Sequence, residues 1–115
     1  NLKKLNVFFD KGIKIIEPLK YLEFLKLMKD CKLVLSDSGG IQEEASILGV
    51  PCVTLRTTTE RQITLLRKVN IMTGYNQNKI IKAVEKFHKK KINKINDFGN
   101  GNVTNKIYKK MITLS

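Results

Sequence analysis

The sequence predicts an α/β protein built on a Rossmann-like parallel sheet with helices on both faces. Short apolar runs alternate with amphipathic helical segments along the 115 residues, an order typical of parallel sheets with right-handed crossovers. An apolar run over 33–35 leads directly into a small-residue turn and a helical segment. Polar turns follow three predicted strands, at the carboxyl edge where such sheets bind ligands. We therefore expect a single, partial Rossmann-like domain over 1–115, since domains usually have ~100–150 residues and the short sheet is expected to lack its first strands.

The N-terminal third predicts a strand, a helix and a second strand. The apolar run 13–16 predicts the first strand, and Pro18 ends it because proline lacks a backbone N–H. Apolar residues at helical spacing predict an amphipathic helix over 20–29. Leu22, Leu25 and Met28 recur in it at intervals of three residues. The run 33–36 predicts the second strand.

The middle of the chain predicts a helix, a third strand and a charged loop. A helix over 40–48 is expected to end at Gly49, because glycine adopts the left-handed conformation that closes many helices. The apolar run 52–55 predicts the third strand. The polar, charged segment 56–61 is expected to be a loop, followed by a short helical piece that runs through Leu66.

The remainder predicts one short strand and two helices. A fourth strand is expected over 70–73, and Asn76 can cap a helix that runs to about Lys91. The segment 93–102 is rich in Asn and Gly and is expected to be a loop. Apolar residues at helical spacing predict a terminal helix at about 103–114.

The chain is strongly basic, with 22 basic and 10 acidic residues and a formal charge of +12. Seven lysines between positions 79 and 94, opposed by Glu85 alone, contribute +6 of this charge. The segment has few aromatic residues and no arginine, so a solvated helix face is favoured over a nucleic-acid patch. No apolar run approaches the ~20 residues of a membrane helix. We expect no nucleic-acid partner, no membrane partner and no secretory leader.

The cysteines and the histidine do not form a pattern that binds metal. Cys31 and Cys52 are too few and too far apart for a metal knuckle. Both lie beside apolar runs, so buried free thiols and a reducing, cytoplasmic location are expected. His88 lies in the lysine-rich helix and is expected to be partly exposed and inert. We expect neither a metal nor a cofactor.

The turn that contains Ser38, Gly39 and Gly40 has the properties of an anion site. The first N–H groups of a helix lack partners and lie at its positive end. Both glycines lack a Cβ, so a phosphate can approach the backbone, and Ser38 can cap the helix or donate to the same phosphate. Glu44 lies one turn further along, where its carboxylate can accept bonds from two sugar hydroxyls. The alternative, an ordinary capped turn without a ligand, is not excluded by the turn alone.

Several motifs occur in order along the chain: EP at 17–18, YL at 21–22, FL at 24–25, DSGGIQEEA at 37–45, LGVP at 48–51, LR at 55–56, TTER at 58–61, and FGNGN at 98–102 with Ile107. Together they resemble the non-hydrolysing UDP-N-acetylglucosamine 2-epimerases. The resemblance spans nearly the whole chain, but it covers only the distal half of the family's second domain. Several motifs in the right order make the resemblance far more specific than any one of them.

The resemblance implies a fold, an activity and partners. The fold is the glycosyltransferase-B type, in which two Rossmann-like domains hold a nucleotide-sugar between them. The activity is inversion of carbon 2 of UDP-N-acetylglucosamine through elimination and re-addition of UDP, which gives UDP-N-acetylmannosamine. The ligands are UDP and UDP-N-acetylglucosamine, no cofactor is required, and the full-length enzyme is expected to be a homodimer that serves polysaccharide biosynthesis.

The resemblance also assigns roles to residues of this chain. Ser38, Gly39 and Gly40 are expected to hold the diphosphate and Glu44 the ribose hydroxyls. Phe24 is expected to pack on the uracil, Leu19 to meet its edge through the backbone, and Arg61 to lie in a charged loop near the phosphates.

Each of these roles has a structural alternative. Phe24 is at helical spacing, which is more often typical of a core position. Arg61 can pair with Glu60 or another surface carboxylate, and Glu43 is expected to point toward solvent.

The chain also departs from the family pattern. Gln62-Ile63 follows Arg61 where the family has Pro-Glu, and Asn100 stands where Asp is usual. The family's acid and base carboxylates and its histidine lie upstream of Asn1, and His88 cannot replace that histidine. Because inversion needs groups that remove and return a proton, we expect no catalytic residue in this chain. The alternative is a stand-alone or degenerate nucleotide-sugar-binding module without catalysis.

Overall fold

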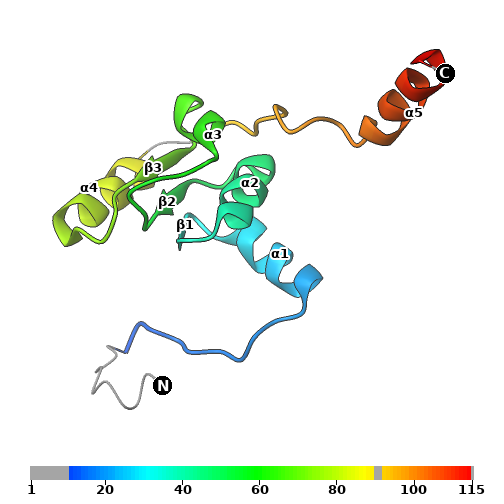
Figure 1. The fold of residues 1–115 in the computed structure, drawn as a ribbon. Helices are drawn as coiled ribbons and strands as arrows, with labels where there is room; N and C mark the ends of the chain where they lie inside the picture. Colours follow the sequence, from blue (N-terminus) through cyan, green and yellow to red (C-terminus); the bar gives the residue numbers. More distant parts are fainter. Residues whose placement is uncertain (1–10, 90–91, 115) are drawn as a thin grey trace.

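The computed structural model describes residues 11–89 and 92–114, and its centre is a parallel sheet of three strands (Figure 1). In chain order the elements are α1 (Tyr21–Asp30), β1 (Val34–Ser36), α2 (Gly39–Leu48), β2 (Cys52–Thr54), α3 (Gln62–Leu66), β3 (Asn70–Met72), α4 (Gln77–His88) and α5 (Val103–Leu114). The strands lie in the order β1-β2-β3, with Val34 opposite Cys52 and Cys52 opposite Asn70. The predicted α/β class and parallel sheet are therefore confirmed.

Helices cover both faces of the sheet because consecutive residues of β2 point in opposite directions. Cys52 packs with Met28 of α1 and Ala45 of α2 in one buried cluster. Val53 packs with Ala83 and Phe87 of α4 in a second buried cluster on the other face. The two small clusters attach the helices to the two faces of the sheet.

The helix ends follow the local rules that the sequence suggested. Ser38 precedes α2, and its Oγ accepts from the N–H of Ile41 at 3.5 Å. Gly49 ends α2 with φ at 78°, in the left-handed region where glycine is favoured. Asn76 precedes α4, and its side-chain oxygen accepts from the N–H of Lys79 at 3.0 Å. The helix α4 ends at His88, which is exposed, and the predicted end near Lys91 lies outside the described residues.

The predicted strand over 13–16 is wrong. These residues pair with no described strand, and their apolar side chains are exposed, Ile15 by 62%. A strand forms only where a neighbour satisfies its backbone groups. In the Rossmann strand order 3-2-1-4-5-6, three parallel strands in sequential order are typical of 4-5-6.

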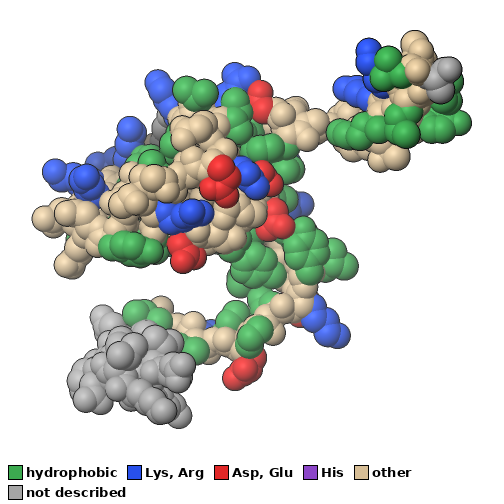
Figure 2. All heavy atoms as spheres, in the orientation of Figure 1, with side chains coloured by type: hydrophobic (Ala, Val, Ile, Leu, Met, Phe, Trp, Pro, Cys, Tyr) green, Lys and Arg blue, Asp and Glu red, His purple; other side chains and the backbone are tan. Residues whose placement is uncertain are grey.

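The terminal helix α5 is present where it was predicted, but it stands apart from the sheet (Figure 1). Every residue of α5 is exposed, and apolar side chains gather along one of its sides (Figure 2). The spacing of Val103, Ile107 and Met111 explains this apolar side, since positions four apart lie on one helix face. Within the described part of the chain, no helix has both the length and the apolar character needed to cross a bilayer.

Candidate functional site

The candidate site lies at the carboxyl edge of the sheet, where the connections after the strands converge. The turn at Asp37 and Ser38 follows β1 and leads into α2, and the segment 55–61 follows β2. These two connections meet, because Glu60 of the second one lies against Gly39 at the start of α2. The structure thus brings together the small-residue turn and the charged loop.

The two glycines of the turn have different surroundings. A Cβ on Gly39 would come within 2.8 Å of Glu60 Oε1, so the end of the Glu60 side chain lies against the backbone here and would have to move for a larger residue. Among the described residues, a Cβ on Gly40 would meet only Ser38 Oγ, at 3.8 Å. Gly40 is exposed, and the backbone beside it is open. The first turn of α2 therefore presents an accessible surface at the positive end of the helix.

The charged loop forms ion pairs across this turn. Arg61 pairs through its Nε with Glu43 of α2, and each side chain is about one-third exposed. Arg56 Nη1 lies 3.8 Å from Glu60 Oε2. Figure 2 shows acidic and basic side chains side by side on this face. The expectation that Glu43 points to solvent is wrong, because the loop after β2 folds back over α2 and brings Arg61 to it. The alternative role for Arg61, pairing with a carboxylate, is present in this structure.

Glu44 is held by a residue that sequence reasoning did not select. The Tyr21 hydroxyl, at the start of α1, donates to Glu44 Oε1 at 2.9 Å. This hydrogen bond is the main cause that raises the pKa of Tyr21 above 10, with smaller contributions from desolvation and the charge of Glu44. The bond joins α1 to α2 at the rim of the site.

Phe24 and Leu19 occupy different environments. Phe24 is half-buried and packs against the cluster that contains Met28 and Cys52, so it serves the core while part of its ring stays accessible. Leu19 lines a separate hollow of about 570 Å³ with Pro18 and other residues of the segment before α1. That hollow shares no lining residue with the Ser38 turn, so this structure does not join Leu19 to the site.

A buried polar network supports the charged loop from beneath. Gln42 of α2 is fully buried, and its Oε1 accepts from Thr59 Oγ1 at 2.8 Å and from Asn70 Nδ2 at 3.2 Å. Asn70 Nδ2 also donates to Thr64 Oγ1 at 3.1 Å, and Asn70 Oδ1 accepts from Thr54 Oγ1 at 2.7 Å. The network links α2, β2, α3, β3 and the loop. Among the described residues, Gln42 Nε2 has no hydrogen-bond partner.

The loop itself is closed by side-chain contacts to its backbone. The N–H of Arg61 donates to Thr59 Oγ1 at 3.0 Å, and Gln62 Nε2 donates to the Thr59 carbonyl at 2.8 Å. Gln62 stands where the resembling family has proline, so the structure gives this departure a role in shaping the loop. One sequence signal could have revealed the network: Thr54 and Asn70 are polar residues inside apolar strand runs, and buried polar residues need partners.

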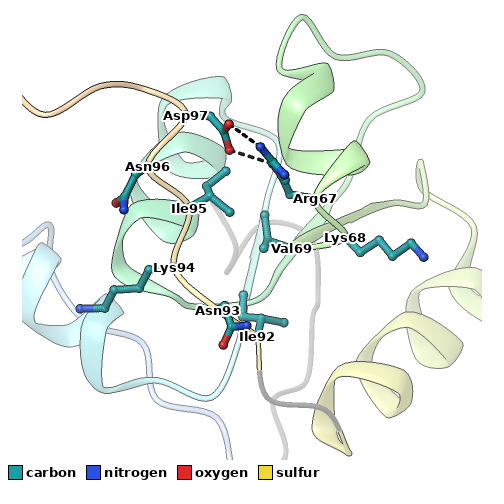
Figure 3. A pocket seen from close by; sticks show the side chains of 9 residues that line it. All are labelled: Arg67, Lys68, Val69, Ile92, Asn93, Lys94, Ile95, Asn96 and Asp97. Carbon is teal, nitrogen blue, oxygen red and sulfur yellow. Dashed lines mark hydrogen bonds and ion pairs between the residues drawn. The ribbon is translucent and has the colours of Figure 1, made fainter.

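Another hollow lies away from the candidate site, at the amino end of β3 (Figure 3). It has a volume of about 540 Å³ and lies between the end of α3 and the segment 92–97. Arg67 makes two hydrogen bonds to the Asp97 carboxylate, at 2.9 and 2.7 Å, which lower the pKa of Asp97. Because parallel strands bind ligands at their carboxyl ends, and because this pair neutralises itself, we assign the hollow a structural role.

Neither a metal site nor a reactive thiol lies in the described part of the chain. Residues 11–89 and 92–114 contain no group of three His, Cys, Asp or Glu side chains that could hold a metal ion. Burial raises the pKa of the Cys52 thiol to about 11, and desolvation also raises the pKa of Cys31. Both thiols are free, as predicted, with Cys52 buried and Cys31 half-buried.

The chain is similar to a set of enzymes that share one description. A family profile described as UDP-N-acetylglucosamine 2-epimerase matches residues 2–112. The UDP-N-acetylglucosamine 2-epimerase of Methanocaldococcus jannaschii is 56% identical over 104 residues, which are 87% of this chain and 28% of that relative. The chain thus spans about a quarter of the length of such relatives.

Solved structures show the same similarity. The crystal structure of the Methanocaldococcus jannaschii UDP-GlcNAc 2-epimerase in complex with UDP-GlcNAc and UDP matches with a TM-score of 0.84 and 51% identity, over 99% of this chain and 31% of that one. The Neisseria meningitidis UDP-GlcNAc 2-epimerase bound to UDP-GlcNAc matches with a TM-score of 0.74 and 36% identity, over 85% of this chain and 28% of that one.

Proposed function

The chain belongs to the UDP-N-acetylglucosamine 2-epimerase family, and we propose that it is the UDP-binding part of an enzyme that interconverts UDP-N-acetylglucosamine and UDP-N-acetylmannosamine. The similarity to structures that hold UDP-GlcNAc and UDP supports this ligand class. The groups that remove and return the proton at carbon 2 lie in the part of the enzyme that this chain does not span. The complete enzyme is a cytoplasmic homodimer that serves polysaccharide biosynthesis.

The observation that supports UDP binding most directly is the open first turn of α2. Its N–H groups lie at the positive end of a ten-residue helix, Ser38 supplies a hydroxyl, and Gly40 leaves the backbone accessible. In the proposed complex these groups, with Gly39, hold the diphosphate. The helix dipole and the hydroxyl favour a negatively charged group at this place.

The nucleoside lies on the α1 side of the turn. Glu44 accepts from the ribose hydroxyls, and the accessible part of Phe24 packs on the uracil. Leu19 meets the uracil edge through its backbone, which requires the segment before α1 to approach the turn. Arg61 contributes positive charge near the phosphates once it exchanges its contact with Glu43 for the ligand.

In the proposed reaction, carbon 2 loses its proton and the bond from carbon 1 to UDP breaks, which yields a glycal and UDP. Re-addition of UDP at carbon 1 and of a proton at carbon 2 on the opposite face gives the epimer. Negative charge on the diphosphate grows as UDP departs. The contribution of this chain is therefore to stabilise the leaving group with donors that are already oriented.

A chimera tests the proposal. Residues 11–114 of this chain replace the matching segment of the Methanocaldococcus jannaschii enzyme, and NMR follows the carbon-2 epimer from UDP-N-acetylglucosamine. We expect turnover, since the segment supplies the UDP site and the host supplies the acid and base. A folded chimera that binds UDP-N-acetylglucosamine without turnover would favour a binding module. A folded chimera that binds neither UDP nor the sugar nucleotide would refute the proposal.

A further inference from the structure

The hydrogen bond between Tyr21 and Glu44, at the rim of the site, has no role yet in the proposed binding of UDP. Tyr21 and Glu44 are 23 positions apart in sequence and come from different helices, yet the Tyr21 hydroxyl donates to Glu44 Oε1 at 2.9 Å. Tyr21 is 61% exposed, so its hydroxyl could be satisfied by water without Glu44. Burial of Tyr21 therefore does not require this hydrogen bond. Its consequence lies at Glu44, whose carboxylate the bond holds in one orientation.

A carboxylate that binds a ribose diol must hold both of its oxygens in place. An ionised glutamate has two acceptor oxygens with about four lone-pair sites, and Tyr21 uses only one of these sites. The remaining sites stay available for two sugar hydroxyls. A free glutamate side chain on a helix surface has several rotamers, and the hydrogen bond from Tyr21 selects among them.

We propose that Tyr21 is a positioning residue, which orients the Glu44 carboxylate for the 2′- and 3′-hydroxyls of a ribonucleotide. This inference rests on the proposed UDP site and adds a determinant of sugar specificity to it. Tyr21 touches neither the phosphate nor the reacting carbon, and it acts through Glu44. Its effect is therefore confined to ligands that have the ribose diol.

The test compares two ligands and two tyrosine variants. UDP and 2′,3′-dideoxy-UDP are titrated by NMR or calorimetry into the chain and into Tyr21→Phe. We expect Tyr21→Phe to weaken UDP binding by about three- to tenfold, the effect of one hydrogen bond, and to leave dideoxy-UDP unchanged. Tyr108→Phe on α5 is the matched control, because Tyr108 is also exposed and lies on a helix apart from the sheet. It should change neither affinity.

A double variant separates positioning from direct contact and from packing. If Tyr21 acts through Glu44, adding Tyr21→Phe to Glu44→Gln should cause no further loss of UDP affinity. Equal losses for UDP and dideoxy-UDP would assign Tyr21 a packing role and overturn the inference. Tighter UDP binding in Tyr21→Phe would also overturn it, because Tyr21 would then compete with the ribose. Wild-type chain that binds both ligands equally refutes the inference alone, whereas failure to bind either ligand refutes the UDP site as well.

Discussion

Thr59 offers a sharp test of the link between the buried network and the charged loop. It is buried, its Oγ1 donates to Gln42 Oε1 at 2.8 Å, and the same atom accepts from the N–H of Arg61 at 3.0 Å. Thr59→Val keeps the shape of the side chain and removes both hydrogen bonds. The neighbour Thr58 is exposed, so Thr58→Val is a matched control that makes the same chemical change at the surface.

The expected magnitude follows from the two lost bonds. Each contributes about 0.5–1.5 kcal/mol net, so the free energy of unfolding should fall by about 1–3 kcal/mol. Gln42 Oε1 still accepts a hydrogen bond from Asn70 in this variant, so no buried acceptor loses its last partner. The decrease in the free energy of unfolding should therefore stay within that range. For Thr58→Val the change should stay within about 0.5 kcal/mol. A loss of ~1 kcal/mol corresponds to a fall in Tm of several degrees for a chain of this size.

The assay is urea unfolding followed by circular dichroism, with a UDP titration of each variant. Thr59→Val should also weaken UDP binding, because the loop that bears Arg61 loses its attachment to α2. Equal stability of the Thr59 and Thr58 variants would refute the network as a support of the loop. Lower stability with unchanged UDP affinity would retain the network but separate it from the site.

Three further predictions concern other parts of the chain. Glu44→Gln should weaken the binding of uridine and of UDP alike by about tenfold, as expected for charge-assisted bonds to ribose. Glu43→Gln should weaken uridine binding less, because Glu43 pairs with Arg61. Equal effects of the two variants on uridine binding would contradict this prediction. The chain alone should form no epimer from UDP-N-acetylglucosamine by NMR, and product above a protein-free control would show that it holds its own acid and base. Ellman's reagent should modify Cys31 faster than Cys52, because burial raises the Cys52 pKa to about 11. Because the pKa of Cys52 is higher in the folded than in the unfolded chain, the free energy of unfolding should be independent of this thiol below about pH 8.5 and should decrease as the pH rises toward 11. Equal rates of modification at Cys31 and Cys52 would refute the burial of Cys52.

Local features of the fold could be predicted because they depend on neighbours in sequence. Ser38 and Asn76 cap helices whose N–H groups lie three residues away, and Gly49 ends its helix through its own backbone conformation. The strand over 13–16 was predicted wrongly for the opposite reason. Its apolar character is local, but its pairing depends on strands far away in the sequence.

The arrangement of the candidate site could be predicted only in part. Small residues between a strand and a helix are typical of an anion-binding turn, so Ser38 and Gly40 could be proposed from the sequence, and their contact with a phosphate stays a prediction. Helical geometry placed Glu43 and Glu44 on different faces, but it could not show that Arg61, 18 residues after Glu43, folds back to pair with it. The contact between Tyr21 and Glu44 depends on the packing of α1 on α2, and no local rule contains that packing.

The measurement that tests the account most directly is UDP binding to Gly40→Ala. A Cβ at this position meets only Ser38 Oγ at 3.8 Å, so the variant should fold with unchanged stability or gain up to about 1 kcal/mol, since alanine favours a helix over glycine. The methyl group points into the space where we place the diphosphate, so UDP affinity should fall by at least about tenfold. Gly12→Ala is the control, because no atom of the described residues lies within 4 Å of its added Cβ. Calorimetry that gives Gly40→Ala the UDP affinity of the unchanged chain would contradict a phosphate site at the start of α2.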